Sequence, residues 1–326
     1  MSDALLTPAR SGAGLGAARR LSIGHAEVAL VAVFLALPFL LSNFWTYTLS
    51  LTLANAIGIL SVSFLIRYGG EVSIGQNFFA AGGAYAVAIL QARYGVPFPV
   101  GAIVGTAAGV LTGLVFSWPS RNLSGVYLSV ATLALGLCVP EILLQWSSVT
   151  GGFEGLYVEP DLVPGVAASV QQFYVALAGL CIAVVALARF RGSRYGIALL
   201  TARYNPKAAE AFGMSLQHVR LLVFAVSAGL AGFGGSVLAF ASSTVSPNSF
   251  SFWSAVYLLV GAVVSLYSTR LIGALVGGMF ITLVPLLMSE YGEIVPIIYG
   301  LALFAVIYMA NVLAPALRAR LRRKRA

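Results

Sequence analysis

Residues 97–117 read PFPVGAIVGTAAGVLTGLVFS and contain no charged side chain. A helix needs about 20 mostly apolar residues to cross the roughly 30 Å hydrocarbon core of a bilayer. The stretch therefore predicts a transmembrane helix. Within it Gly101, Gly105, Gly109 and Gly113 recur at every fourth residue, which places them in one stripe on which another helix can pack closely. Such a stripe serves either plain helix packing or a moving, gate-forming interface.

The composition of the whole chain agrees with a membrane protein. Of 326 residues, 60% are hydrophobic and only 9% are charged, whereas a soluble domain carries about a quarter charged residues. Cys138, Cys181, His25 and His218 have no ligand partners nearby in the sequence, so we expect neither a disulfide nor a metal site. The formal charge of +9 comes from basic residues that flank apolar segments. This placement favours contact with membrane lipid headgroups and excludes nucleic acid as the expected partner.

Ten apolar segments are candidate transmembrane helices. The first follows a basic stretch but lacks a small-residue cleavage signature, so we expect a retained helix rather than a signal peptide. The third and the eighth are the weakest, because one opens with polar residues and the other is short. The segments are 27–46, 49–66, 73–92, 97–117, 126–146, 172–190, 219–241, 252–268, 270–289 and 294–314. The sequence thus predicts an all-α polytopic membrane protein with about ten transmembrane helices, with eight as the alternative.

The basic residues predict the orientation of these helices. With ten spans and a cytoplasmic N-terminus, Arg93 is the one basic residue of nineteen that falls outside, while Glu154 and Glu159 lie in an outer loop. Basic residues gather on the cytoplasmic side of membrane proteins, so we expect both termini in the cytoplasm. The expected parts are a cytoplasmic segment 1–26, a transmembrane domain 27–314 with an outer loop 147–171 and an inner loop 191–218, and a basic cytoplasmic tail 315–326.

Polar residues inside the apolar segments predict where a solute passes. They are costly to expose to lipid, so they usually face the protein interior or a wet pathway. The third segment is both polar and rich in glycine, which suits a broken or re-entrant helix that lines a cavity. Glu141 belongs either to the membrane interface or to the same pathway. The candidate pathway residues are Ser73, Gln76, Asn77, Tyr85, Tyr127 and Thr132.

The inner loop contains a short helix whose two ends are visible in the sequence. Asn205 is a good N-cap, Pro206 suits the first helical position, and Gly213 can adopt the left-handed conformation that ends a helix. A helix of two turns is marginal alone. We therefore expect it either to pack on its own membrane domain or to dock into another protein. Its residues are Asn205, Pro206, Lys207, Ala208, Ala209, Glu210, Ala211, Phe212 and Gly213.

Short motifs in a fixed order extend over roughly residues 45–310. They are GGEVSIG at 69–75, GAY at 83–85, TGGFEGL at 150–156, SRYG at 193–196, the helix at 205–213, SAGLAG at 227–232 and VSPNSFSF at 245–252. In this order they resemble the permeases of branched-chain amino acid ABC importers, of the Liv M type.

The resemblance implies an assembly. The 205–213 helix would be the coupling helix, seated in one of two cytoplasmic ATPase subunits that bind and hydrolyse ATP, so this chain itself would hold no cofactor. A second, related permease subunit and an extracytoplasmic substrate-binding protein would complete the importer in the cytoplasmic (inner) membrane. The cargo would be branched-chain or other hydrophobic amino acids, or related small polar solutes. The residues expected to face the binding protein are Thr150, Gly151, Gly152 and Glu154.

Other function classes have less support in the sequence. Lys207 and Lys324 are the two lysines of the chain, and neither lies in a Walker A loop, so we expect a transport subunit and not an enzyme. A secondary transporter or channel for a small solute is the main alternative. Coupling to protons or sodium usually needs an ionisable group near the bilayer midplane, and none of the ten segments has one there. A signalling or scaffold protein comes third.

Overall fold

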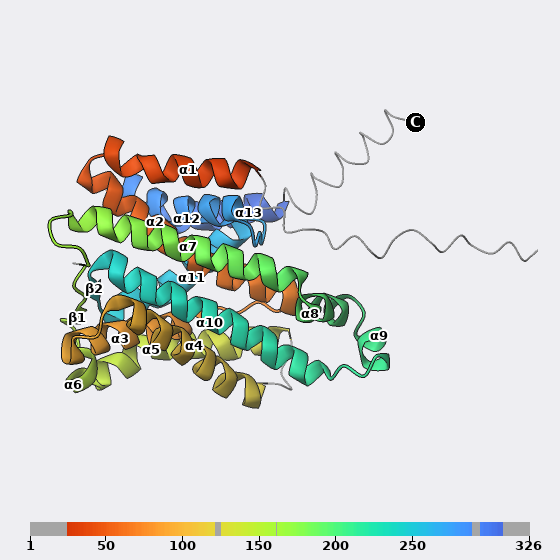
Figure 1. The fold of residues 1–326 in the computed structure, drawn as a ribbon. Coiled ribbons are helices and arrows are strands. Elements are labelled where there is room, and N and C mark those ends of the chain that lie inside the picture. Colours follow the sequence, from red (N-terminus) through yellow and green to blue (C-terminus); the bar gives the residue numbers. More distant parts are fainter. Residues whose placement is uncertain (1–24, 121–124, 161, 289–293, 309–326) are drawn as a thin grey trace, which may run out of the picture.

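The computed structural model describes residues 25–120, 125–160, 162–288 and 294–308. Most of the predicted segment 1–26 and the whole tail 315–326 lie outside these residues. Long helices run side by side, with α8 and α9 at one end of the bundle and α6, β1 and β2 at the other (Figure 1). The helices are α1 (His25–Leu40), α2 (Asn43–Phe64), α3 (Gln76–Tyr94), α4 (Phe98–Ser120), α5 (Val126–Gln145), α6 (Ser147–Thr150), α7 (Ala168–Gly192), α8 (Arg194–Tyr204), α9 (Pro206–Ala211), α10 (Leu216–Ser242), α11 (Phe252–Val264), α12 (Leu271–Leu287) and α13 (Val295–Tyr308).

Each predicted apolar segment overlaps at least one of these helices, but the predicted first segment is too long. α1 ends at Leu40, and α2 begins at Asn43 inside the predicted range 27–46. Ser and Asn favour helix starts over helix interiors, because their side chains compete for backbone hydrogen bonds. Ser42 accordingly is the extended N-cap residue of α2, and its carbonyl accepts from the Thr46 N–H at 3.0 Å.

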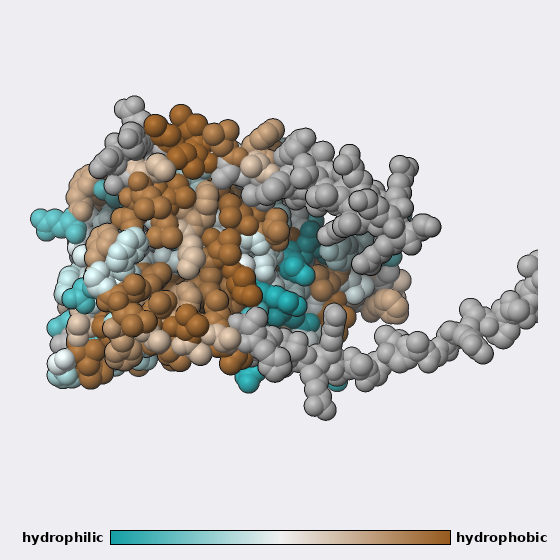
Figure 2. Space-filling model, turned by 90° about the horizontal axis from the view of Figure 1, so that it is seen from above, coloured by the Kyte–Doolittle hydropathy of each residue, from teal (hydrophilic) through white to brown (hydrophobic). Residues whose placement is uncertain are grey.

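Length and composition allow five of the described helices to cross a membrane. They are the continuous helix at 43–69, which adds the π-helical turn η1 (Leu65–Gly69) to α2, and then α4, α5, α7 and α10. Three shorter apolar helices lie at 27–40, 252–264 and 271–287. α3, whose first turn holds Gln76 and Asn77, is not in this group. Seen from above, much of the surface is apolar, and hydrophilic residues gather toward the two ends (Figure 2).

The fold is all-α, as the sequence predicted, apart from one pair of two-residue strands. β1 (Leu156–Tyr157) and β2 (Thr244–Val245) pair antiparallel, with Leu156 opposite Val245. The pairing joins the loop before α7 to the segment after α10. Gly155 makes it possible, since its φ is +72° and a Cβ there would lie 2.3 Å from the Val245 carbonyl oxygen.

Glycines bring α3, α4 and α10 into backbone contact. The stripe on α4 faces these two helices: a Cβ on Gly109 would lie 2.5 Å from the Ala228 oxygen of α10, and one on Gly105 would lie 2.7 Å from the Gly83 oxygen of α3. Gly113 likewise faces Ala228, and Gly101 faces Val87. In lipid, such close approach replaces the hydrophobic drive that packs soluble helices.

Candidate functional site

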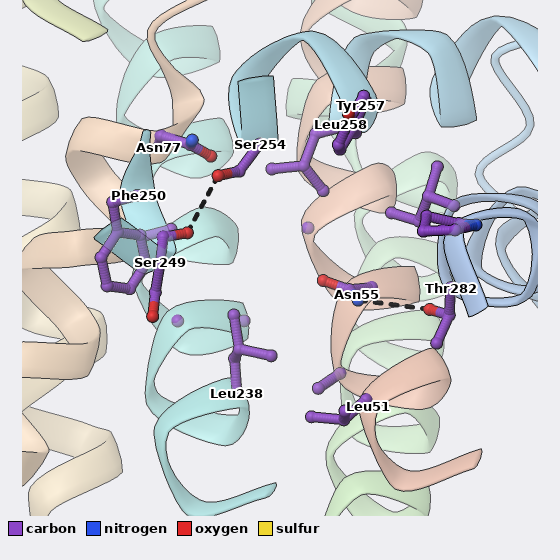
Figure 3. Close-up of a pocket in the computed structure, with 17 residues that line it drawn as sticks. Leu51, Asn55, Asn77, Leu238, Ser249, Phe250, Ser254, Tyr257, Leu258 and Thr282 are labelled. Carbon is purple, nitrogen blue, oxygen red and sulfur yellow. Dashed lines mark hydrogen bonds between the residues drawn. The ribbon is translucent and has the colours of Figure 1, made fainter. Parts of the chain in front are cut away.

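A cavity of about 350 Å³ lies among α2, α3, α10, α11, α12 and the 3-10 turn η2 (Pro247–Phe250) (Figure 3). Its wall is part amide and hydroxyl, part aliphatic, and none of the described residues that line it is charged. The polar lining side chains are Asn55, Asn77, Ser249, Ser254, Tyr257 and Thr282. Leu51, Leu238, Leu258, Ile281 and Pro285 are among the apolar ones. Mixed walls of this kind hold small molecules that have both a polar and an apolar part.

Hydrogen bonds orient the polar groups of this cavity, and two of the three described next join segments far apart in the sequence. The Asn55 Nδ2 of α2 donates to the Thr282 Oγ1 of α12 at 3.3 Å, as Figure 3 shows. The Asn77 Nδ2 of α3 donates to the Ser251 carbonyl at 2.9 Å, and the Ser254 hydroxyl donates to the Ser249 carbonyl at 3.0 Å. These bonds join α2 to α12, and they join α3 and α11 to the segment 249–251.

The segment before α3 supports a second, fully buried polar cluster. Residues 70–75 are not helical, and a Cβ on Gly75 would lie 2.4 Å from the Thr132 carbonyl oxygen of α5. Ile74 N–H donates to the Thr132 hydroxyl at 3.2 Å. The Gln76 Nε2 donates to the Ser227 hydroxyl of α10 at 3.0 Å. Gln76 and Thr132 thus join α3, α5 and α10 and are not among the residues that line the cavity.

The predicted pathway residues therefore occupy different places. Asn77 lines the cavity, whereas Ser73, Gln76, Tyr85 and Thr132 are buried in the bundle outside its wall. Tyr127, at the start of α5, is 77% exposed. Sequence reasoning missed Asn55, Ser254, Tyr257 and Thr282. A signal existed for Asn55 and Thr282, because each is a polar residue well inside an apolar segment.

The short helix of the inner loop is present as α9. Pro206 is its first residue, and Gly213, at φ +77°, lies just beyond its end, as the sequence predicted. Ala209 is fully buried, which anchors the helix on the bundle, while Phe212 is 81% exposed. Asn205 also ends α8, donating its backbone N–H to Thr201 O at 2.9 Å, so α8 and α9 form one bent unit.

A second cavity, of about 370 Å³, lies where this unit meets the bundle. Glu71 and Arg220 line it and form an ion pair, with Nε and Oε1 3.4 Å apart. Burial raises the pKa of the Glu71 carboxyl above its ordinary value, and the charge of Arg220 opposes that shift. Arg203 of α8 donates to the Arg67 carbonyl. The α8–α9 unit is thereby tied to η1, the turn directly before the loop 70–75 that leads into Gln76 and Asn77.

Comparison with known proteins identifies the family. Residues 46–311 match the family described as the permease component of branched-chain amino acid transport systems. The chain belongs to this family. It is the membrane-spanning permease subunit of an ABC importer, which decides against the secondary-transporter alternative.

Individual relatives agree with this assignment of the permease. This chain is 26% identical over 334 residues to the high-affinity branched-chain amino acid transport system permease protein LivM of Escherichia coli K12. The match covers 91% of this chain and 76% of that protein. The chain is 24% identical over 252 residues to a probable branched-chain amino acid transport permease protein LivH of Methanocaldococcus jannaschii, covering 73% of this chain and 78% of that one. No solved structure matches it.

At the end opposite α9, the TGGFEGL segment of the permease forms a tight turn. Thr150 is buried and its hydroxyl donates to the Leu143 carbonyl at 2.6 Å, while Gly151 and Gly152 take φ values of +78° and +59°. Glu154 is exposed. Of the four residues predicted to contact a binding protein, Glu154 is the one that presents a side chain outward; the other three shape the turn.

Proposed function

We propose that this permease imports branched-chain or other hydrophobic amino acids, and that the 350 Å³ cavity holds the solute during passage. The observation that carries the proposal is the mixed, uncharged wall of the cavity in a chain of this family. Amides and hydroxyls can hydrogen-bond the polar end of an amino acid, and the leucine side chains accommodate an apolar side chain. A net charge would lack a counter-charge among the described lining residues and would be costly to bury.

The proposed arrangement in the inner membrane has ten spans and cytoplasmic termini. Nearly all basic residues then lie inside, and α9 lies at the cytoplasmic end. The α6–β1–β2 end then faces outward, where Glu154 can meet a substrate-binding protein. A second, related permease and two ATPase subunits complete the importer.

We further propose that α9 is the coupling helix. Ala209 fixes it to the bundle and leaves Phe212 and Tyr204 exposed, at 81% and 78%, for an ATPase to contact. Motion of the α8–α9 unit reaches η1 through the bond from Arg203 to Arg67, and η1 leads into the polar loop 70–75. ATP on the partner subunits would then shift the population between inward-facing and outward-facing states.

Reconstitution tests this function. The chain is assembled with its ATPase subunits, partner permease and binding protein in proteoliposomes, and uptake of radiolabelled leucine is measured with and without ATP. We expect concentrative uptake with ATP in the assembly and none for the chain alone. Uptake by the chain alone, driven by a proton or sodium gradient, would contradict the proposal.

A conservative substitution tests the cavity. Thr282→Val keeps the shape of the side chain but removes the acceptor for Asn55 Nδ2, and we expect slower uptake. The matched control is Thr112→Val in α4, whose hydroxyl bonds only to carbonyls of its own helix, at 2.8 and 3.1 Å. Equal uptake by both variants would place the solute elsewhere.

A further inference from the structure

α12 carries a proline in the wall of the cavity. Pro285 lies inside the helix and lines the cavity together with Ile281 and Thr282. Proline has no backbone N–H, so residue 285 cannot donate to the carbonyl four residues earlier. That carbonyl belongs to Ile281, a residue only 7% exposed. A buried carbonyl without its helical donor needs another partner.

A side chain from α13 supplies that partner. The hydroxyl of Tyr299 donates to the Ile281 carbonyl oxygen at 3.0 Å, and Tyr299 is 2% exposed. Its ring stacks on Tyr257 of α11, with centroids 4.3 Å apart and planes at 20°. It also meets the ring of Phe280 edge-on at 5.2 Å. Tyr257 itself lines the cavity, so Tyr299 lies directly behind the wall.

The helix around Pro285 is thus held from two sides. From α13, Tyr299 holds the carbonyl of Ile281; from α2, Asn55 holds the side chain of the next residue, Thr282. A proline inside a helix weakens its backbone ladder and permits a kink. The angle of α12 at this point, and with it the position of Thr282 and Pro285 on the wall, depends on these two bonds.

We propose that Tyr299 is a positioning residue of the transport cavity: it provides the donor that Pro285 lacks and so fixes the width of the cavity and the size of the apolar solute it accepts. The part about the solute rests on the proposed function. The part about the wall of the cavity does not.

The first experiment measures how accessible the cavity is to a small reagent, in the assembled transporter in nanodiscs. Cys138 and Cys181 are replaced by Ala, Ser254→Cys places a thiol in the cavity, and its labelling rate with a small maleimide is followed. Tyr299→Phe should raise the rate about three- to tenfold, the size of effect expected from one net hydrogen bond. Pro285→Ala restores a backbone N–H that can reach Ile281 O. In that background Tyr299→Phe should therefore change the rate little.

The control is a tyrosine of the same kind at another place. Tyr174 of α7 donates to the Leu35 carbonyl of α1 at 3.1 Å, close to Pro38, and lines no part of this cavity. Tyr174→Phe should leave the labelling of Ser254→Cys unchanged. A Tyr299→Phe rate within about twofold of the parent overturns the proposal. So does an equal increase in the Pro285→Ala background, because Tyr299 would then act through packing alone.

The second experiment measures selectivity. In proteoliposomes, Tyr299→Phe should raise the ratio of phenylalanine to valine uptake about three- to tenfold, and Tyr174→Phe should not. An unchanged ratio overturns the selectivity part. If the parent importer takes up no amino acid at all, the proposed function fails. The labelling experiment still decides whether Tyr299 determines the position of the cavity wall.

Discussion

At the scale of single residues, the closest helix contacts depend on a missing Cβ. A Cβ on Gly83 would lie 1.9 Å from the Gly232 carbonyl oxygen, whereas one on the neighbouring Gly82 would meet nothing within 4 Å. Gly83→Ala must push α3 from α10, and overpacking of this kind costs about 1–3 kcal/mol. We therefore expect a lower midpoint in a thermal unfolding assay of the purified protein in detergent.

Gly82→Ala is the matched control for this prediction. It sits in the same helix, one residue away, and gains helix propensity of up to about 1 kcal/mol over glycine. Its midpoint should equal or slightly exceed that of the parent. Two variants with the same midpoint would show that α3 and α10 do not touch at Gly83.

At the scale of elements, α9 and the residue that follows it allow a folding role to be tested separately from the proposed coupling role. Phe212→Asp changes a side chain that is 81% exposed, so the unfolding midpoint should stay the same while ATP-driven uptake falls steeply. Phe212→Leu keeps an apolar contact and should retain most of the uptake. Full uptake by Phe212→Asp would remove the coupling role from α9.

Ala209→Asp provides the opposite result on the same helix. Ala209 is fully buried, and an unpaired carboxylate there is costly, so this variant should lose stability before it loses coupling. Co-purification of the ATPase subunits measures assembly, and it distinguishes a loss of stability from a loss of coupling. Phe212→Asp should still yield a folded membrane subunit.

The same elements show what a sequence can predict. The ends of α9 were predictable because Pro206 and Gly213 act through their own backbone conformations, within a few residues. The gap between α1 and α2 was harder to see, since residues 41–42 interrupt an otherwise apolar run. The β1–β2 pair could not be found from strand length, because each strand has only two residues and pairs across the whole of α7–α10.

The cavity was the least predictable part. Asn55 and Thr282 meet although 227 positions separate them, and only the packing of α2 against α12 brings them together. Gln76, which the sequence predicted to line the pathway, donates its Nε2 to Ser227, while its buried Oε1 has no hydrogen-bond partner among the described residues. Polarity in an apolar segment thus indicates a buried residue, and the tertiary contacts decide whether it faces a cavity or a neighbouring helix.

At the scale of the whole molecule, the two ends of the bundle should lie on opposite sides of the membrane. Between Phe153 and Phe212 the one helix long and apolar enough to span, among the described residues, is α7, with 25 residues. At about 1.5 Å per residue it exceeds the roughly 30 Å of a hydrocarbon core. Figure 1 shows the segments before and after it at opposite ends.

Cysteine labelling in cells tests this topology. In a chain without Cys138 and Cys181, Phe153→Cys and Phe212→Cys place thiols at positions that are 77% and 81% exposed. In cells that lack the ATPase subunits, a membrane-impermeant maleimide added outside should label Phe153→Cys at once and Phe212→Cys only after the membrane is permeabilised. Labelling in the reverse order would mean that the protein has the opposite orientation in the membrane. α9 would then lie outside, where a cytoplasmic ATPase cannot contact it. Labelling of both from outside would mean that α7 does not span, and an even count of ten would fail with it.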